Sequence, residues 1–223
     1  MGRNKTVMIA DDHTLVAQAC QKLLAQEFHV VAIVGDGHSL IRSAMALKPD
    51  VILIDIHMPR LNGLDAGQQI IRILPQVKLV YATESPDLEL AAEAFRRGAS
   101  GYLLKTSAAT DIITAIRHAL NNEIFISAGI ARESIETTIA AGVPTNATAL
   151  TIRQREVLQL LAEGHAMKQV ADVLNLTTRT VAFHKYRIRE ALNLSNDAEM
   201  VRYAVEHHLL SAASSSGFTT TSL

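Results

Sequence analysis

The stretch Val51-Ile52-Leu53-Ile54-Asp55 decides the fold of this chain. Four apolar side chains run directly into an aspartate, and the turn-forming segment 56–63 follows. A short, uniformly apolar run bounded by turn signals predicts a strand that is buried on both faces of a parallel sheet. Because ligand chemistry in open α/β sheets gathers at the carboxyl ends of strands, Asp55 is predicted to lie in a crevice. Taken alone, Asp55 could equally be a polar residue that ends the strand.

Composition narrows the class of protein. The 223 residues allow one large or two modest domains, and 48% hydrophobic residues with only 4% aromatic ones indicate aliphatic cores. A net charge of -1 carries no information about partners, and a single cysteine excludes a disulfide framework and a cysteine-rich metal site. The amino-terminal segment lacks the pattern of a signal peptide, and no apolar run approaches ~18 residues. We therefore expect a soluble, cytoplasmic protein with no membrane partner.

The first half of the chain alternates short apolar runs with segments of helical periodicity. Strands are predicted at 6–10, 30–34, 51–55, 77–81 and 101–104. Helices are predicted at 14–27, 38–47, 64–74, 86–97 and 108–121. Turn signals such as Gly35, Pro75 and Gly98 separate these segments. Alternating strands and helices of this length predict an α/β fold with a doubly wound parallel sheet of five strands.

The predicted strands deliver polar side chains to one edge of this sheet. Asp11 and Asp12 follow the first strand, Asp55 ends the third, Thr83 follows the fourth and Lys105 follows the fifth. Three carboxylates repel one another unless a cation lies among them, and oxygen ligands suit Mg²⁺. A lysine can hold a phosphoryl oxygen, and a threonine can donate its hydroxyl to one. We therefore predict a site that places a phosphoryl group on Asp55. Taken singly, Lys105 could be a solvated residue at the end of a strand, and Thr83 could cap the helix predicted at 86–97.

Residues 5–121 resemble the receiver domain of bacterial response regulators, which has a flavodoxin-like fold. The matching pieces are Asp11-Asp12, Asp55 with Met58-Pro59 and Gly63, Thr83, and Gly101-Tyr102-Leu103-Leu104-Lys105. The resemblance implies that Asp55 accepts phosphate from a sensor histidine kinase, with Thr83 and Lys105 assisting the chemistry. It implies that Mg²⁺ is held by Asp11, Asp12, Asp55 and the backbone carbonyl of His57. It also implies that Thr83 and Tyr102 form a switch pair.

The second half has the pattern of a helix-turn-helix. Residues 122–149 have a looser pattern, with a candidate helix at 128–141 and a linker at 140–148. Helices are predicted at 150–162, 167–174, 177–192 and 196–209. With a 3.6-residue period, one side of the helix predicted at 177–192 is expected to pack against the core. This side carries Val181, His184, Ile188 and Leu192. Residues 177–191 carry four basic side chains against one acidic, which suits phosphate contacts but also an ordinary solvated face.

Residues 149–210 resemble the LuxR-type helix-turn-helix of the NarL/FixJ class of response regulators. The matching pieces lie in 150–164 and 168–174 and at Thr180, Val181, His184 and Ile188. The resemblance implies binding to double-stranded DNA as a homodimer, with RNA polymerase as a further partner. The expected DNA contacts are Arg179, Thr180, Ala182, Phe183, Tyr186, Arg187 and Arg189. Ala182 and Tyr186 depart from the basic or polar residues common in the family, so Phe183 and Tyr186 are candidates for contacts with thymine methyls or sugar edges.

These expectations assign a receiver domain to 1–122, a linker to 123–148, a helix-turn-helix domain to 149–210 and a disordered tail to 211–223. The leading hypothesis is a DNA-binding response regulator, not an enzyme, in which phosphorylation of Asp55 controls dimerisation and transcription. One alternative is a protein-binding regulator with weak DNA affinity, which Ala182 and Tyr186 suggest. The other is a Mg²⁺-dependent phosphatase with an aspartyl nucleophile. Against it, His57 stands where a second acid would be needed.

Overall fold

The computed structural model describes residues 5–84, 86, 88–107, 109–128, 130 and 150–210, without the side chains of Glu89 and Ile152. The described residues form two compact units, one built around a sheet and one helical. The candidate helix at 128–141, the linker at 140–148 and the tail at 211–223 lie outside the described residues, apart from positions 128 and 130.

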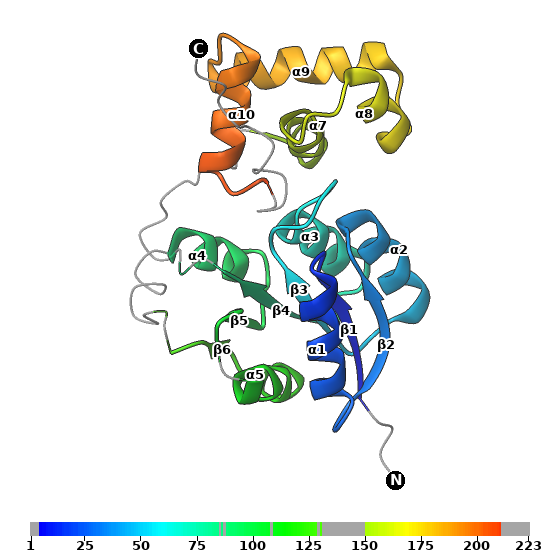
Figure 1. The fold of residues 1–223 in the computed structure, drawn as a ribbon, viewed down its shortest axis with the longest axis vertical. Helices are drawn as coiled ribbons and strands as arrows, with labels where there is room; N and C mark the ends of the chain where they lie inside the picture. The colour runs from blue at the N-terminus through cyan, green and yellow to red at the C-terminus, as the bar shows by residue number, and fades with distance from the viewer. Residues whose placement is uncertain are drawn as a thin grey trace. The chain divides into compact units, whose positions relative to one another are not determined.

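The first unit is a parallel sheet flanked by helices (Figure 1), with the strand order β2-β1-β3-β4-β5-β6. The strands are β1 (Thr6–Ala10), β2 (His29–Val34), β3 (Val51–Asp55), β4 (Lys78–Thr83), β5 (Gly101–Leu104) and β6 (Phe125–Ile126). The helices are α1 (Thr14–Leu24), α2 (Gly37–Leu47), α3 (Gly63–Ile73), α4 (Leu88–Arg96) and α5 (Ala109–Leu120). All neighbouring strands pair in parallel, which confirms the predicted doubly wound α/β class.

The sheet has one strand more than the sequence predicts. In the short edge strand β6, Phe125 pairs with Gly101 of β5 and Ile126 pairs with Tyr102. Two residues are too few to show a period-2 pattern, so they fall within the linker predicted at 123–148. Other differences are small. The helix expected from Pro86 begins at Leu88, and the helix expected to reach residue 27 ends at Leu24.

The central strands carry the core. Every residue of β1 and β3 is buried, because helices cover both faces of the sheet. On one face, Cys20 and Leu24 of α1 and Ile116 of α5 belong to a hydrophobic cluster with side chains of four strands. Helices α2, α3 and α4 cover the other face (Figure 1). Burial on both faces explains the continuous apolar runs in the sequence, and it gives Asp55 a rigid support.

Gly63 fixes the geometry at the end of β3. A Cβ atom at this position would lie 2.1 Å from the backbone oxygen of Asp55, so only glycine fits. The backbone N–H of Gly63 donates to the carbonyl of Ile56 at 2.8 Å, which starts α3 close to the strand it follows. The backbone around Asp55 is therefore positioned by close packing on a neighbouring helix.

The second unit consists, in its described part, of α7 (Ile152–Ala162), α8 (Met167–Leu174), α9 (Thr178–Leu192) and α10 (Asp197–Glu206). Leu158, Val170, Val181, Ile188 and Met200 are members of its hydrophobic core. Of the α9 residues predicted to face inward, Val181 and Ile188 are fully buried, while His184 and Leu192 are half-buried. The inward face of α9 therefore agrees with the predicted helical period.

Helix caps define the helix-turn-helix. Thr151 and Gln154 form a capping box at the start of α7, because each side chain accepts the backbone N–H of the other residue, at 3.2 and 2.7 Å. Asn175 ends α8 in the left-handed conformation, with φ of 53°. The Thr177 hydroxyl then accepts the N–H of Thr180 at 3.1 Å and starts α9.

Among the described residues, no helix has the length and apolarity needed to cross a membrane.

Candidate functional site: an acidic cluster on the sheet and an exposed helix

The carboxyl ends of four neighbouring strands meet at one edge of the first unit. Asp11 follows β1, Asp55 ends β3, Thr83 ends β4 and Lys105 follows β5. β3 pairs with β1 on one side and with β4 on the other, and β4 pairs with β5. The parallel register therefore brings side chains from distant parts of the chain to one edge, where ligand sites of open α/β sheets form.

Lys105 connects two of the carboxylates. Its Nζ atom lies 2.8 Å from Oδ2 of Asp55 and 2.8 Å from Oδ2 of Asp11, and all three side chains are buried. The other carboxylate oxygens accept backbone amides: Oδ1 of Asp55 accepts the N–H of His57 at 3.1 Å, and Oδ1 of Asp11 accepts the N–H of His13 at 2.8 Å. The ammonium group and the amides together hold two like charges close to each other.

Burial shapes the titration of this pair. It raises the pKa of the Asp55 carboxyl to about 6, because the charged form loses hydration, while Lys105 opposes the rise and Asp11 adds to it. Burial by itself lowers the pKa of Lys105, but Asp55 and Asp11 outweigh this effect, so the net pKa of Lys105 is raised. The pair is therefore charged at neutral pH, and Asp55 takes up a proton in mildly acidic solution.

The edge also gathers possible metal ligands. One ligand atom each from Asp11, Asp12, His13 and Asp55 lie within 4.8 Å of one another. Nδ1 of His13 is 3.0 Å from Oδ1 of Asp12 and 3.4 Å from Oδ1 of Asp11. Three hard oxygen donors fit Mg²⁺, which takes few carboxylates and keeps several waters. His13 is not among the residues predicted for this site, although its place directly after Asp11-Asp12 in the sequence was a signal.

The residues predicted to form a switch pair are both completely buried. Thr83 is the last residue of β4, and Tyr102 lies in the neighbouring strand β5 with its ring centroid 6.5 Å from that of Phe95 in α4. In this structure Tyr102 therefore points into the protein. The His57 side chain, two residues beyond Asp55, is half-buried.

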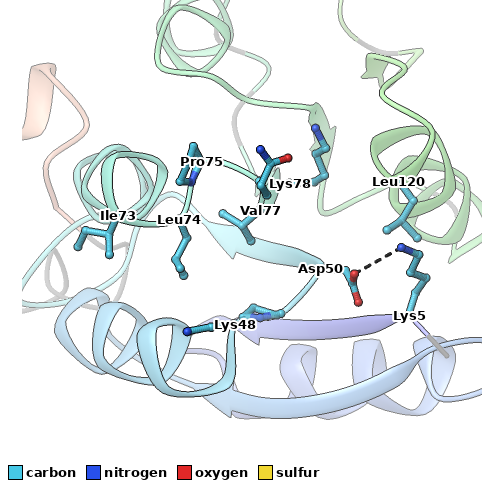
Figure 2. Close-up of a pocket in the computed structure, with 11 residues that line it drawn as sticks. Lys5, Lys48, Asp50, Ile73, Leu74, Pro75, Val77, Lys78 and Leu120 are labelled. Carbon is cyan, nitrogen blue, oxygen red and sulfur yellow. Dashed lines mark hydrogen bonds and ion pairs between the residues drawn. The ribbon is translucent and has the colours of Figure 1, made fainter. Parts of the chain in front are cut away.

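A cavity of about 400 Å³ lies at the opposite edge of the sheet (Figure 2). Three of its polar side chains are at the amino-terminal ends of strands, where Lys5 precedes β1, Asp50 precedes β3 and Lys78 begins β4. Lys5 pairs with Asp50, with Nζ 3.4 Å from Oδ1. Because none of the strand-end residues predicted for phosphoryl chemistry lines this cavity, it is separate from the acidic cluster.

In the second unit, α9 presents most of the residues predicted to contact DNA. The side chains that are exposed are Arg179, Ala182, Phe183, Tyr186 and Arg187, and those that are half-buried are Thr180 and Arg189. Thr180 shares a hydrogen bond of 2.8 Å with the Thr177 hydroxyl at the cap. The exposed face of the helix therefore combines basic and aromatic side chains.

Three of the four basic residues of α9 have partners within the unit. Lys185 pairs with Asp197 at 2.6 Å, and Arg187 pairs with Glu190 at 2.6 Å. Arg189 donates to the backbone carbonyls of residues 194 and 195. Within the described part of the chain, Arg179 makes no such contact, so its guanidinium is available to an external anion.

Family models match both units. The response regulator receiver domain matches residues 7–117, and the luxR family of bacterial regulatory proteins matches residues 148–204. The chain is 30% identical to the response regulator GacA of Pseudomonas aeruginosa, over 93% of this chain and 99% of GacA. It is 35% identical to the uncharacterized transcriptional regulatory protein YxjL of Bacillus subtilis, over 92% of this chain and 96% of YxjL.

Solved structures of regulators are similar as well. The Salmonella typhimurium RcsB response regulator gives a TM-score of 0.61 at 26% identity, over 92% of this chain and 99% of RcsB. An RcsB–DNA complex gives a TM-score of 0.54 at 25% identity, over 91% of this chain and 98% of that RcsB chain. A parallel α/β unit followed by a helix-turn-helix unit defines a regulatory protein of the two-component class. This chain belongs to the response regulators that carry a receiver domain and a LuxR-type DNA-binding domain.

Proposed function

We propose that this response regulator uses Asp55 as its phosphoacceptor and a sensor histidine kinase as the donor. The observation that supports this most directly is the Nζ atom of Lys105 at 2.8 Å from both Asp55 and Asp11. A phosphoryl group on Asp55 would meet a buried cation already in place. Asp11, Asp12, Asp55 and the backbone carbonyl of His57 would hold Mg²⁺, which supplies positive charge to the phosphoryl oxygens when bound.

The transfer would be a direct displacement at phosphorus. An ionised oxygen of Asp55 attacks the phosphorus atom of a phosphohistidine on the kinase, and the P–N bond breaks as the O–P bond forms. The imidazole nitrogen keeps the electron pair and takes up a proton. Lys105 exchanges one carboxylate contact for a phosphoryl oxygen, and the Thr83 hydroxyl donates to another. Since the nucleophile is the carboxylate, protonation of Asp55 in acid slows the reaction.

Phosphorylation would control the DNA-binding unit through a two-state equilibrium. In this proposal Thr83 moves toward the phosphoryl group, Tyr102 rearranges with it, and the chain pairs with a second copy on two half-sites of double-stranded DNA. Related RcsB structures are complexes with DNA, which supports this interpretation of α9. The proposed contacts are those predicted from the sequence, namely Arg179, Thr180, Ala182, Phe183, Tyr186, Arg187 and Arg189.

We further propose a class of protein, domain limits and a place in the cell for this chain. The relatives are regulators, which favours a role as a regulator over one as an enzyme. The proposed domain limits are 1–122, 123–148, 149–210 and 211–223, with β6 at 125–126 extending the sheet beyond the first limit. A regulator of transcription would work in the cytoplasm, where RNA polymerase is a further partner.

The first experiment tests phosphorylation. The full chain is incubated with Mg²⁺ and a small phosphoramidate donor, and intact masses are measured for the wild type, Asp55→Asn and the control Asp111→Asn, which changes another carboxylate of the same unit. One phosphoryl adduct is expected on the wild type and the control, and none on Asp55→Asn. An adduct on Asp55→Asn would show that another residue is the acceptor.

The second experiment tests DNA binding by salt-dependent gel shift. Arg179→Ala and Phe183→Ala are expected to weaken binding while Asp55 phosphorylation stays normal, because the two surfaces lie in different units. Arg72→Ala removes an exposed charge from α3 and serves as the control for net charge. The affinity should fall with rising salt if phosphate contacts contribute. Wild-type protein that never shifts DNA would instead support a protein-binding regulator.

A further inference from the structure

The exposed surface around α9 carries large apolar side chains. The Phe183 and Tyr186 side chains are 59% and 63% exposed, and Met167 at the start of α8 is 38% exposed. Ala182 is exposed as well and adds only a methyl group. Removing exposed apolar side chains from water is favourable, so this part of the surface favours a partner that presents apolar groups.

Met167, Ala182 and Tyr186, but not Phe183, border a shallow hollow of about 580 Å³. It is lined by Met167, Ala182, Lys185, Tyr186, Arg189, Glu190, Asn193 and Leu194. The small side chain of Ala182 contributes to the open space, since a long side chain at this position would extend into it. Met167 and Tyr186 supply apolar walls that belong to two different helices.

The charged groups around the hollow already have partners within the unit. Lys185 pairs with Asp197, Glu190 pairs with Arg187, and Arg189 donates to the backbone carbonyls of residues 194 and 195, which follow α9. A bidentate contact from Arg189 to a guanine would require the hydrogen bonds from Arg189 to these carbonyls to break. Apart from the polar side chain of Asn193, the lining groups that could contact a base without breaking an ion pair or a hydrogen bond to the backbone are Met167, Ala182, Tyr186 and Leu194, which offer mainly apolar surface.

We propose that this hollow reads thymine, through contact of Met167, Ala182 and Tyr186 with the C5-methyl group in the major groove. This inference rests on the proposed DNA-binding function and adds the chemical class of the base. The thymine methyl is the apolar feature that base edges present in the major groove, and cytosine carries a hydrogen atom at the same position. The hollow would thus separate thymine, or 5-methylcytosine, from cytosine.

The experiment uses the full chain treated with phosphoramidate and Mg²⁺. A preferred sequence is first selected from duplexes with a randomised centre, and the selected duplex is then synthesised with deoxyuridine replacing thymidine at one position at a time. This change removes one methyl group and keeps base pairing. We expect the Kd to rise by about fourfold at one or more positions of each half-site, the effect of losing about one buried CH₂-sized group. Deoxyuridine in the flanking sequence should leave the Kd unchanged.

Variants link this effect to the hollow. In Met167→Ala and Tyr186→Ala, the ratio of the Kd values for the deoxyuridine and thymidine duplexes should fall toward one. Met45→Ala, which truncates a comparably exposed methionine of the receiver unit, should keep the wild-type ratio. Tight binding with no effect of deoxyuridine at any position would overturn this inference alone. No selectable DNA sequence at all would overturn the proposed DNA binding and this inference with it.

Discussion

The Nζ atom of Lys105 lies 2.8 Å from Oδ2 of Asp55, and both side chains are buried at the carboxyl edge of the sheet. We predict that Lys105→Met slows phosphorylation of Asp55 by about tenfold to a hundredfold, because the phosphoryl group loses a hydrogen bond from a buried cation. The rate of adduct growth with phosphoramidate and Mg²⁺, followed by intact mass, measures the effect. Lys5→Met, which removes a lysine at the opposite edge of the sheet, is the control. Equal rates for the two variants would argue against a role for Lys105.

Stability should depend on pH through Asp55. Its pKa is near 3.8 in the unfolded chain and is raised to about 6 by burial in the folded protein. At a pH between these two pKa values, the folded protein holds a proton that the unfolded chain has released. The stability that Asp55 contributes is therefore fully present below its unfolded pKa and is lost as the pH rises through its folded pKa. Without divalent cations, the free energy of unfolding relative to Asp55→Asn should fall by about 1 to 3 kcal/mol across this window. Urea unfolding of both proteins at a series of pH values measures this fall. A difference in the free energy of unfolding that stays constant with pH would contradict the prediction.

Much of the fold could be predicted because the central strands are buried on both faces. Continuous apolar runs such as 51–55 are typical of such strands, and the five longer strands were found in this way. β6 was missed because two residues, Phe125 and Ile126, show no period. Its place in the sheet depends on pairing with β5, which is a tertiary contact.

The site was predictable in outline for a related reason. Parallel strands bring their carboxyl ends to one edge, so Asp11, Asp55 and Lys105 could be grouped from the sequence. That Lys105 contacts both carboxylates at once, and that His13 turns its Nδ1 toward Asp12, depends on side-chain conformation. On α9, the partners of Lys185 and Arg189 lie beyond the end of the helix, at Asp197 and at the carbonyls of residues 194 and 195, so no helical period predicts them, whereas Arg187 pairs with Glu190 at the (i,i+3) spacing.

The contact between α3 and β4 makes a prediction about Gly67. A Cβ atom at Gly67 would lie 2.0 Å from the phenol oxygen of Tyr81, which is fully buried and has no hydrogen-bond partner within the described part of the chain. Gly67→Ala should destabilise the protein by about 1 to 3 kcal/mol, since overpacking outweighs the better helix propensity of alanine. Tyr81→Phe removes the clashing atom and should restore part of the loss. A double-mutant cycle from urea unfolding tests this, and purely additive effects would refute it.

Arg97 forms a buried ion cluster between α3 and the end of α4. Its Nη1 lies 2.7 Å from Oδ1 of Asp65 and its Nε 2.6 Å from Oε1 of Glu93, while the side chains of Arg97 and Asp65 are only 9% and 1% exposed. Arg97→Met should lower the free energy of unfolding by about 3 to 5 kcal/mol, because it leaves the Asp65 carboxylate buried without its arginine. Chemical unfolding of the receiver unit within the full chain measures the loss.

The neighbouring arginine provides a matched control. Arg96 also pairs with Glu93, at 2.8 Å, but its side chain is 27% exposed, so Arg96→Met should cost about 1 kcal/mol or less. Combining Asp65→Asn with Arg97→Met should be less harmful than Arg97→Met alone, because the buried charge disappears together with its partner. If Arg96→Met and Arg97→Met destabilise the protein equally, burial is not what makes the Arg97 cluster important. If the double variant is the weaker protein, packing of the Arg97 stem matters more than the charge of Asp65.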